Sequence, residues 1–397
     1  MKDLQQLQLN TLLEVTQAIN NNVSEESLYK MFLFITLSNL KFGELDLLVK
    51  EDDHWQSKAS KGLSLTYDEI EYLVNLETEE EILALSNFDN KPRLLKAEYV
   101  VKVSHKKSLL AFVVLGGKKK EVHTLEELTF VKTLANIIMV AIENKRLGRK
   151  ELEQTIVKKE LEVASKVQSL LLPKIIPDNE LLSMHVSYIP HQTVGGDYYD
   201  YIPLSKEEFI FCIADVSGKG VPAAILMSNF QAALRALARL NLDLEKIANE
   251  LNTQIVSNSE GMHFVTAFIG KINCETKKLT YINAGHNQPF LVNQEKVERL
   301  ALGTTVLGAL DELPFINIGE IAFPKGTFLT SFTDGVSETM NRDNEEFGDE
   351  PLEGIIREHC GHSLPEIHDE IIADLYTFKQ DIPFNDDMTL LSIRMNS

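Results

Sequence analysis

Four segments in the second half of the chain place an aspartate at the end of an apolar, strand-like run or directly before one. They are residues 193–200 (TVGGDYYD), 209–220 (FIFCIADVSGKG), 328–336 (FLTSFTDGV) and 385–389 (NDDMT). One aspartate in a glycine-rich turn is common and indicates little. Several such carboxylates at neighbouring strand ends would repel one another strongly unless a cation lay among them. The pattern therefore favours a strand-rich domain whose turns converge on a cation site.

The residue types in these turns also indicate which cation would bind. Oxygen ligands without histidine or cysteine select Mg²⁺ or Mn²⁺ in octahedral geometry rather than zinc. Glycines beside the aspartates, such as Gly196 and Gly218, let backbone carbonyls and bound water approach an ion closely. We therefore expect a site for hard cations.

The hydrophobic pattern of residues 181–397 predicts mostly strands. The expected strands span residues 185–189, 198–203, 208–215, 264–273, 278–284, 289–293, 315–321, 327–333 and 388–395. Helices are expected at residues 222–240, 243–257 and 364–377. Many antiparallel strands with a few long helices predict a β-sandwich flanked by helices.

Residues 1–145 show a different pattern, and a chain of 397 residues usually forms more than one domain. Apolar residues at helical spacing predict a first helix that ends near Asn20 and a second that begins near Ser24. Strands are expected at residues 44–50, 54–61, 99–103 and 109–115, followed by a closing helix from Thr124 to Ile142. The predicted fold class is α+β, with an N-terminal α/β sandwich.

A charged segment at residues 146–180 is expected to link the two domains as a helix. Ile156, Val163 and Leu170 keep a seven-residue step, but Lys159 and Lys166 interrupt the second apolar seam. A helix paired in a homodimer and a solvated spacer with one apolar stripe both remain open. The expected domains are therefore residues 1–145, a linker at 146–180, and residues 181–397.

Composition excludes several classes of partner. The net charge of −20 makes nucleic acid or an anionic membrane an unfavourable partner. Cys212, Cys274 and Cys360 have neither metal-ligand nor disulfide spacing. The N-terminus has no apolar signal core, and the apolar stretch at residues 136–142 is too short to span a bilayer. A cytoplasmic location is expected.

The motifs in residues 161–395 resemble the metal-dependent PPM phosphatases (protein phosphatase type 2C), in the bacterial branch of the sporulation-stage-II-E domain. The resemblance rests on ELEVASKVQSLLLP, GGDYYD, ADVSGKGVPAAILM, VTAFIG, YINAGHNQP, FTDGVSETMN and NDDMTLL, in that order. It implies an αββα sandwich with two Mn²⁺ or Mg²⁺ ions. A hydroxide bridging the ions would attack phosphoserine or phosphothreonine in line, without a covalent phosphoenzyme.

The resemblance also assigns expected ligands. Asp197 matches a ligand of one ion, Asp215 matches the carboxylate that bridges both, and the carbonyl of Val216 takes the next ligand position. Asp334 matches a ligand of the other ion. The aspartate of the last motif is a further ligand, and the family's pattern favours Asp386 over Asp387.

Other residues near the motifs have less defined roles. Asp200 is expected behind the metal ligands or at the turn, and Gly196 and Gly218 behind the ligands or beside the substrate. Eukaryotic members carry a histidine where this chain has Ser217, so no protein general acid is assigned. No arginine lies near GGDYYD in the sequence, and Lys219 is the candidate phosphate contact. His286 is interpreted as a hydrogen-bonded turn residue.

The N-terminal domain resembles GAF domains through its closing helix, LANIIMVAIENKRL, which implies a sensor or dimerisation module with an unidentified effector. The phosphatase family implies that the helix after GKGVP and the linker helix form a switch that controls assembly of the metal site. The implied substrate is a phosphorylated regulatory protein of the anti-sigma-factor-antagonist type.

Two alternatives compete with the phosphatase. One is a non-catalytic dimeric signalling scaffold with a degenerate phosphatase domain. The other is a diguanylate cyclase, because GGDYYD resembles the Gly-Gly-Asp signature of those enzymes. The DVSGKG and NDDMT motifs have no counterpart in the cyclase fold, which favours the phosphatase.

Overall fold

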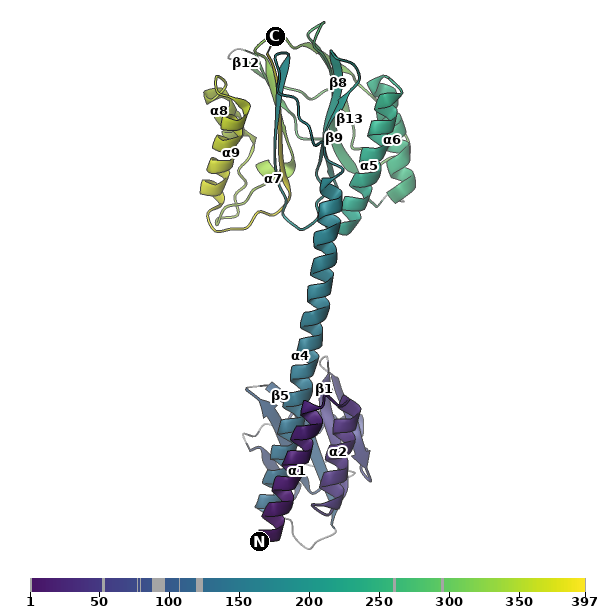
Figure 1. Ribbon diagram of the computed structural model, residues 1–397, viewed down its shortest axis with the longest axis vertical. Coiled ribbons are helices and arrows are strands. Elements are labelled where there is room, and N and C mark those ends of the chain that lie inside the picture. The colour runs from purple at the N-terminus through teal and green to yellow at the C-terminus, as the bar shows by residue number, and fades with distance from the viewer. Residues whose placement is uncertain are drawn as a thin grey trace. The chain divides into compact units, whose positions relative to one another are not determined.

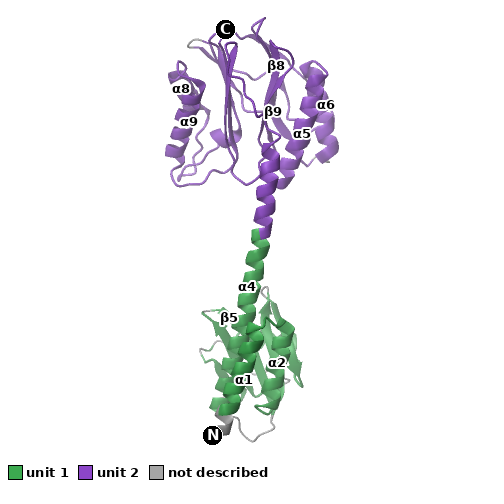
Figure 2. Cartoon of the chain, in the orientation of Figure 1, with its two compact units in different colours: residues 1–155 green, residues 156–397 purple. Residues whose placement is uncertain are grey.

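A computed structural model gives the fold of the chain. It describes residues 2–51, 54–76, 78, 80–87, 97–106, 108–118, 124–259, 262–293 and 296–396. The chain divides into two compact units, residues 1–155 (unit 1) and residues 156–397 (unit 2), which Figure 2 distinguishes by colour.

Unit 1 is built around one antiparallel sheet with the strand order β2-β1-β5-β4-β3. The strands are β1 (Phe42–Glu51), β2 (His54–Lys61), β3 (Ile82–Ala84), β4 (Tyr99–His105) and β5 (Ser108–Lys118), with a 3₁₀ turn at Leu85–Asn87. The helices are α1 (Lys2–Asn20), α2 (Glu25–Ser38), α3 (Tyr67–Val74) and α4 (Leu125–Ser169). Side chains of α1, α2 and α4, such as Val15, Phe32 and Leu134, form the core on one face of the sheet. A smaller cluster around Leu73 and Phe112 covers the other face.

Helix α4 differs from its prediction in length. A closing helix ending near Ile142 and a separate linker helix were expected, but the structure has one continuous helix from Leu125 to Ser169 (Figure 1). The apolar stripe ends near Ile142 because the core of unit 1 ends there, while the helix continues through charged residues to Ser169. Ile156, Val163 and Leu170 are exposed in this chain.

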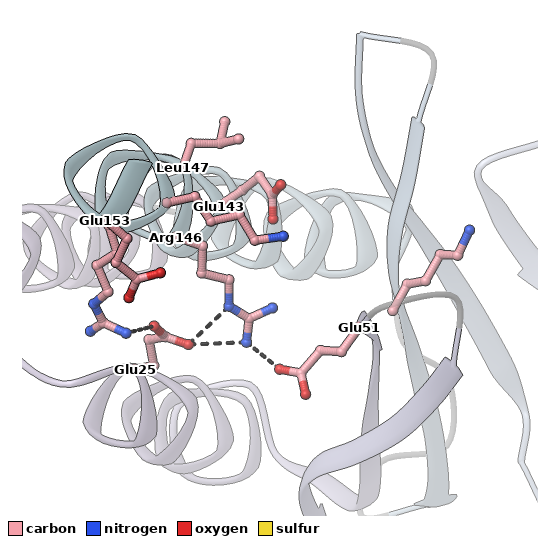
Figure 3. A pocket seen from close by; sticks show the side chains of 9 residues that line it. Glu25, Glu51, Glu143, Arg146, Leu147 and Glu153 are labelled. Carbon is pink, nitrogen blue, oxygen red and sulfur yellow. Dashed lines mark hydrogen bonds and ion pairs between the residues drawn. The ribbon is translucent and has the colours of Figure 1, made fainter. Parts of the chain in front are cut away.

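An ion-pair network fixes α4 to unit 1 where the helix leaves its core. Arg146 pairs with Glu25 of α2 and Glu51 of β1, and Arg149 pairs with Glu25 at 3.0 Å. Figure 3 shows the Arg146 guanidinium between the two carboxylates, in a cavity of ≈ 440 Å³. Lys145 donates to the carbonyls of Asn22 and Val23, the loop after α1. These contacts attach the helix to three other segments of the unit.

Unit 2 contains two sheets between two pairs of helices (Figure 1). The first sheet has the order β13-β10-β9-β8-β7, with β14 also paired to β10. Its strands are β7 (Tyr198–Pro203), β8 (Glu208–Val216), β9 (Val265–Asn273), β10 (Lys278–Ala284), β13 (Gly303–Thr304) and β14 (Gly319–Ala322). The second has the order β12-β11-β15-β16-β6. Its strands are β6 (Leu182–Ile189), β11 (Phe290–Asn293), β12 (Lys296–Arg299), β15 (Phe328–Phe332) and β16 (Met388–Met395).

The helices of unit 2 are α5 (Val221–Arg239), α6 (Leu244–Ser259), α7 (Asp334–Ser337), α8 (Asp349–Glu358) and α9 (Leu364–Lys379). Three apolar clusters separate the four layers. One packs α5 and α6 on the first sheet, one fills the space between the sheets, and one packs α8 and α9 on the second sheet. The predicted helix-flanked β-sandwich is therefore confirmed.

Several expected elements differ from the observed ones. The strand expected at residues 315–321 is reduced to β14, Gly319–Ala322, and α8 and β12 were not predicted. Asp334 begins the short helix α7 rather than lying in a turn. Helix α5 is long and apolar enough to cross a membrane by length and composition, but Met227, Phe230 and Leu234 on it belong to the core shared with α6 and β8.

Candidate metal centre

The four acidic motifs meet at one end of the two sheets. Asp197 directly precedes β7, Asp215 is the penultimate residue of β8, Asp334 follows β15, and Asp386 precedes β16. The first two residues therefore come from one sheet and the last two from the other. Hydrogen bonds join the sheets at this end, because Thr333 and Thr389 both donate to Oδ2 of Asp197, at 2.8 and 2.5 Å. Folding of the sandwich thus brings together residues nearly 200 positions apart in the sequence.

Crowding and burial perturb these carboxyl groups. Burial raises the pKa of Asp197 well above its ordinary value, and the Asp215 carboxylate raises it further. The pKa of Asp215 is raised to about 7, mainly by burial and then by the negative charges of Asp334 and Asp386. The pKa of Asp334 is raised by burial and then by Asp386. Carboxylates that disfavour one another's ionised form in this way provide the negative field that a bound cation would neutralise.

Asp386 and Asp387 have different surroundings despite their adjacency. Both oxygens of Asp387 accept backbone hydrogen bonds, from the N–H groups of His191 at 2.8 Å and Gly196 at 2.9 Å. Asp387 is buried, and its oxygens fix the loop that carries Asp197. The side chain of Asp386 is 38% exposed and pairs with the ammonium of Lys219 at 2.6 Å. Its carboxylate charge also acts on both Asp215 and Asp334.

Two glycines allow the backbone to approach these carboxylates. A Cβ atom on Gly196 would lie 2.9 Å from the carbonyl oxygen of Val216 and 3.4 Å from Oδ1 of Asp215. A Cβ atom on Gly195 would lie 2.0 Å from Oδ2 of Asp387. The space above the Val216 carbonyl therefore exists only because residue 196 has no side chain.

Lys219 is occupied by protein groups in this structure. Besides Asp386, its ammonium donates to the carbonyl of Asn385 at 2.6 Å. The side chain therefore lies at the acidic cluster, as the sequence suggested, where it holds the segment before β16.

Asp200 does not belong to the cluster. It is fully buried and accepts hydrogen bonds from the Tyr198 hydroxyl and from Nε and Nη2 of Arg235, at 2.7 and 2.9 Å for the arginine. Sequence reasoning missed Arg235, which lies 35 residues further along on α5. The signal was an arginine among the apolar residues of that helix. Its guanidinium pairs with Asp200, and this ion pair attaches α5 to β7.

His286 is buried behind the site. Its Nδ1 lies 3.0 Å from Oγ1 of Thr266, and its backbone N–H donates to Oδ1 of Asn283 at 2.8 Å. Burial lowers the pKa of His286 to about 3. A neutral, hydrogen-bonded histidine in a turn agrees with the structural interpretation of this residue.

A second histidine, His263, was missed by sequence reasoning. It precedes β9, and its Nδ1 lies 3.1 Å from the carbonyl oxygen of Ser217, two residues after Asp215. The hydroxyl of Ser217 accepts from the N–H of Phe264 at 2.8 Å. The only sequence signal was its position directly before the strand expected at residues 264–273.

Helix α4 also reaches the site, through Gln168. Its Nε2 donates to the carbonyl of Gly195, and its Oε1 accepts from the N–H of the same residue. Gln168 lines a cavity of ≈ 420 Å³ together with Tyr188, Asp197 and Met227. The loop before Asp197 is thus held by α4 on one side and by Asp387 on the other.

The oxygen ligands of this cluster are of the kind that two hard cations bind, although the side chains do not surround a common point. Across the residues that the structure describes, no three His, Cys, Asp or Glu side chains form a ready-made metal site. The raised pKa values of Asp215 and Asp334 and the close approach of Gly196 to the Val216 carbonyl favour oxygen-bound cations here.

Comparison with known proteins agrees with this architecture. A family model described as "Stage II sporulation protein E (SpoIIE)" matches residues 205–396. The phosphoserine phosphatase RsbU of Bacillus subtilis (strain 168) is 31% identical over 241 residues, which are 60% of this chain and 70% of RsbU. The phosphoserine phosphatase RsbP of the same organism is 22% identical over 228 residues, which are 56% of this chain and 54% of RsbP.

A solved structure supports the same fold. The SiaA-PP2C domain of Pseudomonas aeruginosa superposes with a TM-score of 0.55 and 23% sequence identity, covering 61% of this chain and 98% of that domain. The GGDYYD segment, which also resembles diguanylate cyclases, therefore lies within a PP2C fold. From its αββα sandwich and its similarity to RsbU, the chain belongs to the SpoIIE-type PPM family of serine phosphatases.

Proposed function

We propose that this chain hydrolyses phosphoserine or phosphothreonine on a regulatory partner protein, using two Mn²⁺ or Mg²⁺ ions. The observation that carries the proposal is the convergence of Asp197, Asp215, Asp334 and Asp386 at one end of the sandwich. Burial there, and then the neighbouring carboxylates, raise the pKa of Asp215 to about 7. A carboxylate cluster of this kind is stable as a set of anions only with cations among them.

Asp197, Asp215 and the Val216 carbonyl would hold one ion, and Asp215, Asp334 and Asp386 the other. We assign Asp386 rather than Asp387, because both oxygens of Asp387 are already engaged by backbone N–H groups. When bound, the ions supply an activated water and neutralise charge on the phosphoryl group. Thr333 and Thr389 orient Asp197 by donating to the same oxygen.

The partner is proposed by analogy to be a phosphorylated protein of the anti-sigma-factor-antagonist type, in the cytoplasm. RsbU and RsbP, two relatives, are both phosphoserine phosphatases. The net charge of −20 supports a protein partner rather than a nucleic acid.

Regulation by unit 1 is a further part of the proposal. Helix α4 carries both the Arg146 network of unit 1 and the Gln168 contact to the loop before Asp197. An effector or a second copy of the chain acting on unit 1 could change the position of Gln168, and with it the loop that orients Asp197.

The test uses the full-length chain with MnCl₂ and a phosphoserine peptide. Asp215→Asn and Asp334→Asn are expected to abolish hydrolysis and to weaken Mn²⁺ binding in calorimetry. Asp374→Asn, at an exposed position of α9, is the matched control and should retain wild-type turnover. Wild-type rates in the two site variants would contradict the assignment. Feeble Mn²⁺ binding by the wild-type chain would favour a non-catalytic scaffold.

A further inference from the structure

The turn that follows Asp215 holds its own serine against the backbone of a neighbouring segment. The N–H of Ser217 donates to the carbonyl of Phe264 at 2.9 Å, and the Ser217 hydroxyl accepts from the N–H of Phe264 at 2.8 Å. Ser217 is therefore used to join this turn to the start of β9. Its hydroxyl oxygen is engaged by the N–H of Phe264.

The same segment supplies an imidazole to the turn. Nδ1 of His263 lies 3.1 Å from the carbonyl oxygen of Ser217. Because a carbonyl oxygen only accepts, Nδ1 carries the hydrogen, which leaves Nε2 as the second functional atom of the ring. Within the described part of the chain, Nε2 has no hydrogen-bond partner.

The position of this ring is fixed by its surroundings. A Cβ atom on Gly218 would lie 3.5 Å from Cε1 and 3.6 Å from Nδ1 of His263, so the ring packs against the glycine backbone. Gly218 has φ +96°, a conformation that other residues rarely adopt. The carbonyl of His263 accepts from the Ser259 hydroxyl at 3.1 Å. An imidazole held at one nitrogen with the other free is the arrangement used for proton transfer.

We propose that His263 is the proton donor to the serine oxygen that leaves the phosphoryl group. The inference rests on the proposed function, since it requires hydrolysis at the acidic cluster. The ring contacts Ser217 and Gly218, in the turn between Asp215 and Lys219. Ser217 directly follows Val216, whose carbonyl is a proposed metal ligand. Eukaryotic members carry a histidine at the position of Ser217, and His263 would supply an imidazole to the same turn from a different segment of the chain.

The proton balance of the step is simple. A water oxygen forms the new P–O bond while the bond from phosphorus to the serine oxygen breaks, and the Nε2 proton of the His263 imidazolium passes to that serine oxygen. The attacking water loses one proton to solvent, and solvent returns one to Nε2. The products are serine and hydrogen phosphate.

This role predicts a dependence on the leaving group. A serine alkoxide is a strong base and needs a proton as it leaves, whereas p-nitrophenolate is a weak base that leaves without one. His263→Gln in the full-length chain should therefore reduce kcat/KM for a phosphoserine peptide by about 10²-fold. For p-nitrophenyl phosphate, kcat/KM should change by less than about threefold, and Mn²⁺ binding in calorimetry should be unchanged.

His359→Gln is the matched control. His359 is also half-buried and its Nδ1 lies 3.0 Å from a backbone carbonyl, that of Ile355 in α8. This variant should match the wild-type rates on both substrates.

Each other outcome overturns a definite part of the argument. Equal losses of His263→Gln on both substrates, or no loss on either, would overturn the proton-donor role and leave the phosphatase assignment standing. If Asp215→Asn hydrolysed the phosphopeptide as well as the wild-type chain, the proposed function itself would fail, and this inference with it.

Discussion

Gln168 of α4 is hydrogen-bonded twice to the backbone of Gly195, through Nε2 to the carbonyl oxygen at 2.7 Å and through Oε1 from the N–H at 3.3 Å. Gly195 lies two residues before Asp197. The next N–H along the chain, that of Gly196, is bound by Asp387. The loop that orients Asp197 is therefore held by two side chains, and only one of them belongs to the sandwich.

Replacing Gln168 should lower activity without unfolding the domain. In Gln168→Ala both hydrogen bonds are lost, which is expected to reduce kcat/KM for a phosphoserine peptide by about tenfold, equivalent to about 1.4 kcal/mol. Thermal unfolding of unit 2 should change by only a few degrees, because its core is untouched. Steady-state kinetics and calorimetry measure the two quantities.

Gln154→Ala provides the control, since Gln154 is an exposed residue of the same helix. If both alanine variants had the same activity as the wild-type chain, the contact between Gln168 and Gly195 would have no role in orienting Asp197.

Asp386 and Asp387 should respond differently to the same substitution. Asp386→Asn is expected to weaken Mn²⁺ binding by tenfold or more while the free energy of unfolding changes by about 1 kcal/mol or less. Asp387→Asn removes one of the two acceptors for the N–H groups of His191 and Gly196, of which that of Gly196 is buried, and should cost about 1–3 kcal/mol of stability. Calorimetric Mn²⁺ titration and urea unfolding distinguish them, and equal destabilisation by the two changes would contradict the assignment.

A buried histidine packed against the second sheet should make stability depend on pH. His368 of α9 lies 2.9 Å from Oγ of both Ser187 and Ser392, through its two ring nitrogens. Burial, and then His185, lower its pKa to about 3, against 6.5 for an unperturbed histidine. Between these values the unfolded chain binds a proton that the folded chain does not, so this contribution to stability falls as the pH decreases from 6.5 toward 3.

Comparing the unfolding free energies of the wild-type chain and His368→Gln separates the contribution of His368 from those of other titrating groups. His368→Gln should reduce the dependence of the unfolding free energy on pH by about 1.4 kcal/mol per unit between pH 6 and 4. His54→Gln, at an exposed position of β2, should leave the dependence unchanged. The measurement is urea unfolding at a series of pH values. Parallel plots of unfolding free energy against pH for the wild-type chain and His368→Gln would refute the prediction.

The Arg146 network should stabilise the attachment of α4 in unit 1. Arg146→Met leaves Glu25 and Glu51 with fewer counter-ions, although Arg149 and Lys58 still pair with them. Because the Arg146 side chain is 24% exposed, the expected cost is about 1 kcal/mol. Hydrogen exchange of α2 and β1 would measure it, and the cost should diminish in high salt. Arg149→Met, at a more exposed side chain, should cost less than about 0.5 kcal/mol.

Much of unit 2 could be predicted from sequence because its strands are short apolar runs bounded by turns. The expected spans of β7, β10 and β16 match the observed ones. The first half of the strand expected at residues 315–321 is not a strand, because Ile316 and Ile318, like Leu313 before them, pack on the α5–α6 core instead of entering the sheet. Strand pairing depends on a partner with free hydrogen-bonding groups, which local pattern does not reveal.

The site shows a similar limit. Asp386 and Asp387 have identical chemistry and adjacent positions, and only the direction of the N–H groups of His191 and Gly196 distinguishes them. His263 and Arg235 act on residues 35 to 46 positions away, so no local motif contains the pair. Motifs predicted the carboxylates, while the residues that orient them emerged only from tertiary contacts.

The dependence of Asp197 on Asp387 and Thr389, at the start of β16, also has a consequence for the order of synthesis. Asp197 leaves the ribosome about 190 residues before Asp387 and Thr389, whose side chains hold its loop and its carboxylate. A nascent chain that has completed β7 and β8 therefore cannot yet orient Asp197, and proteolytic removal of β16 would release it again. Only a chain finished through this strand can hold Asp197 in the orientation that the structure shows, so incomplete copies lack an ordered acidic cluster.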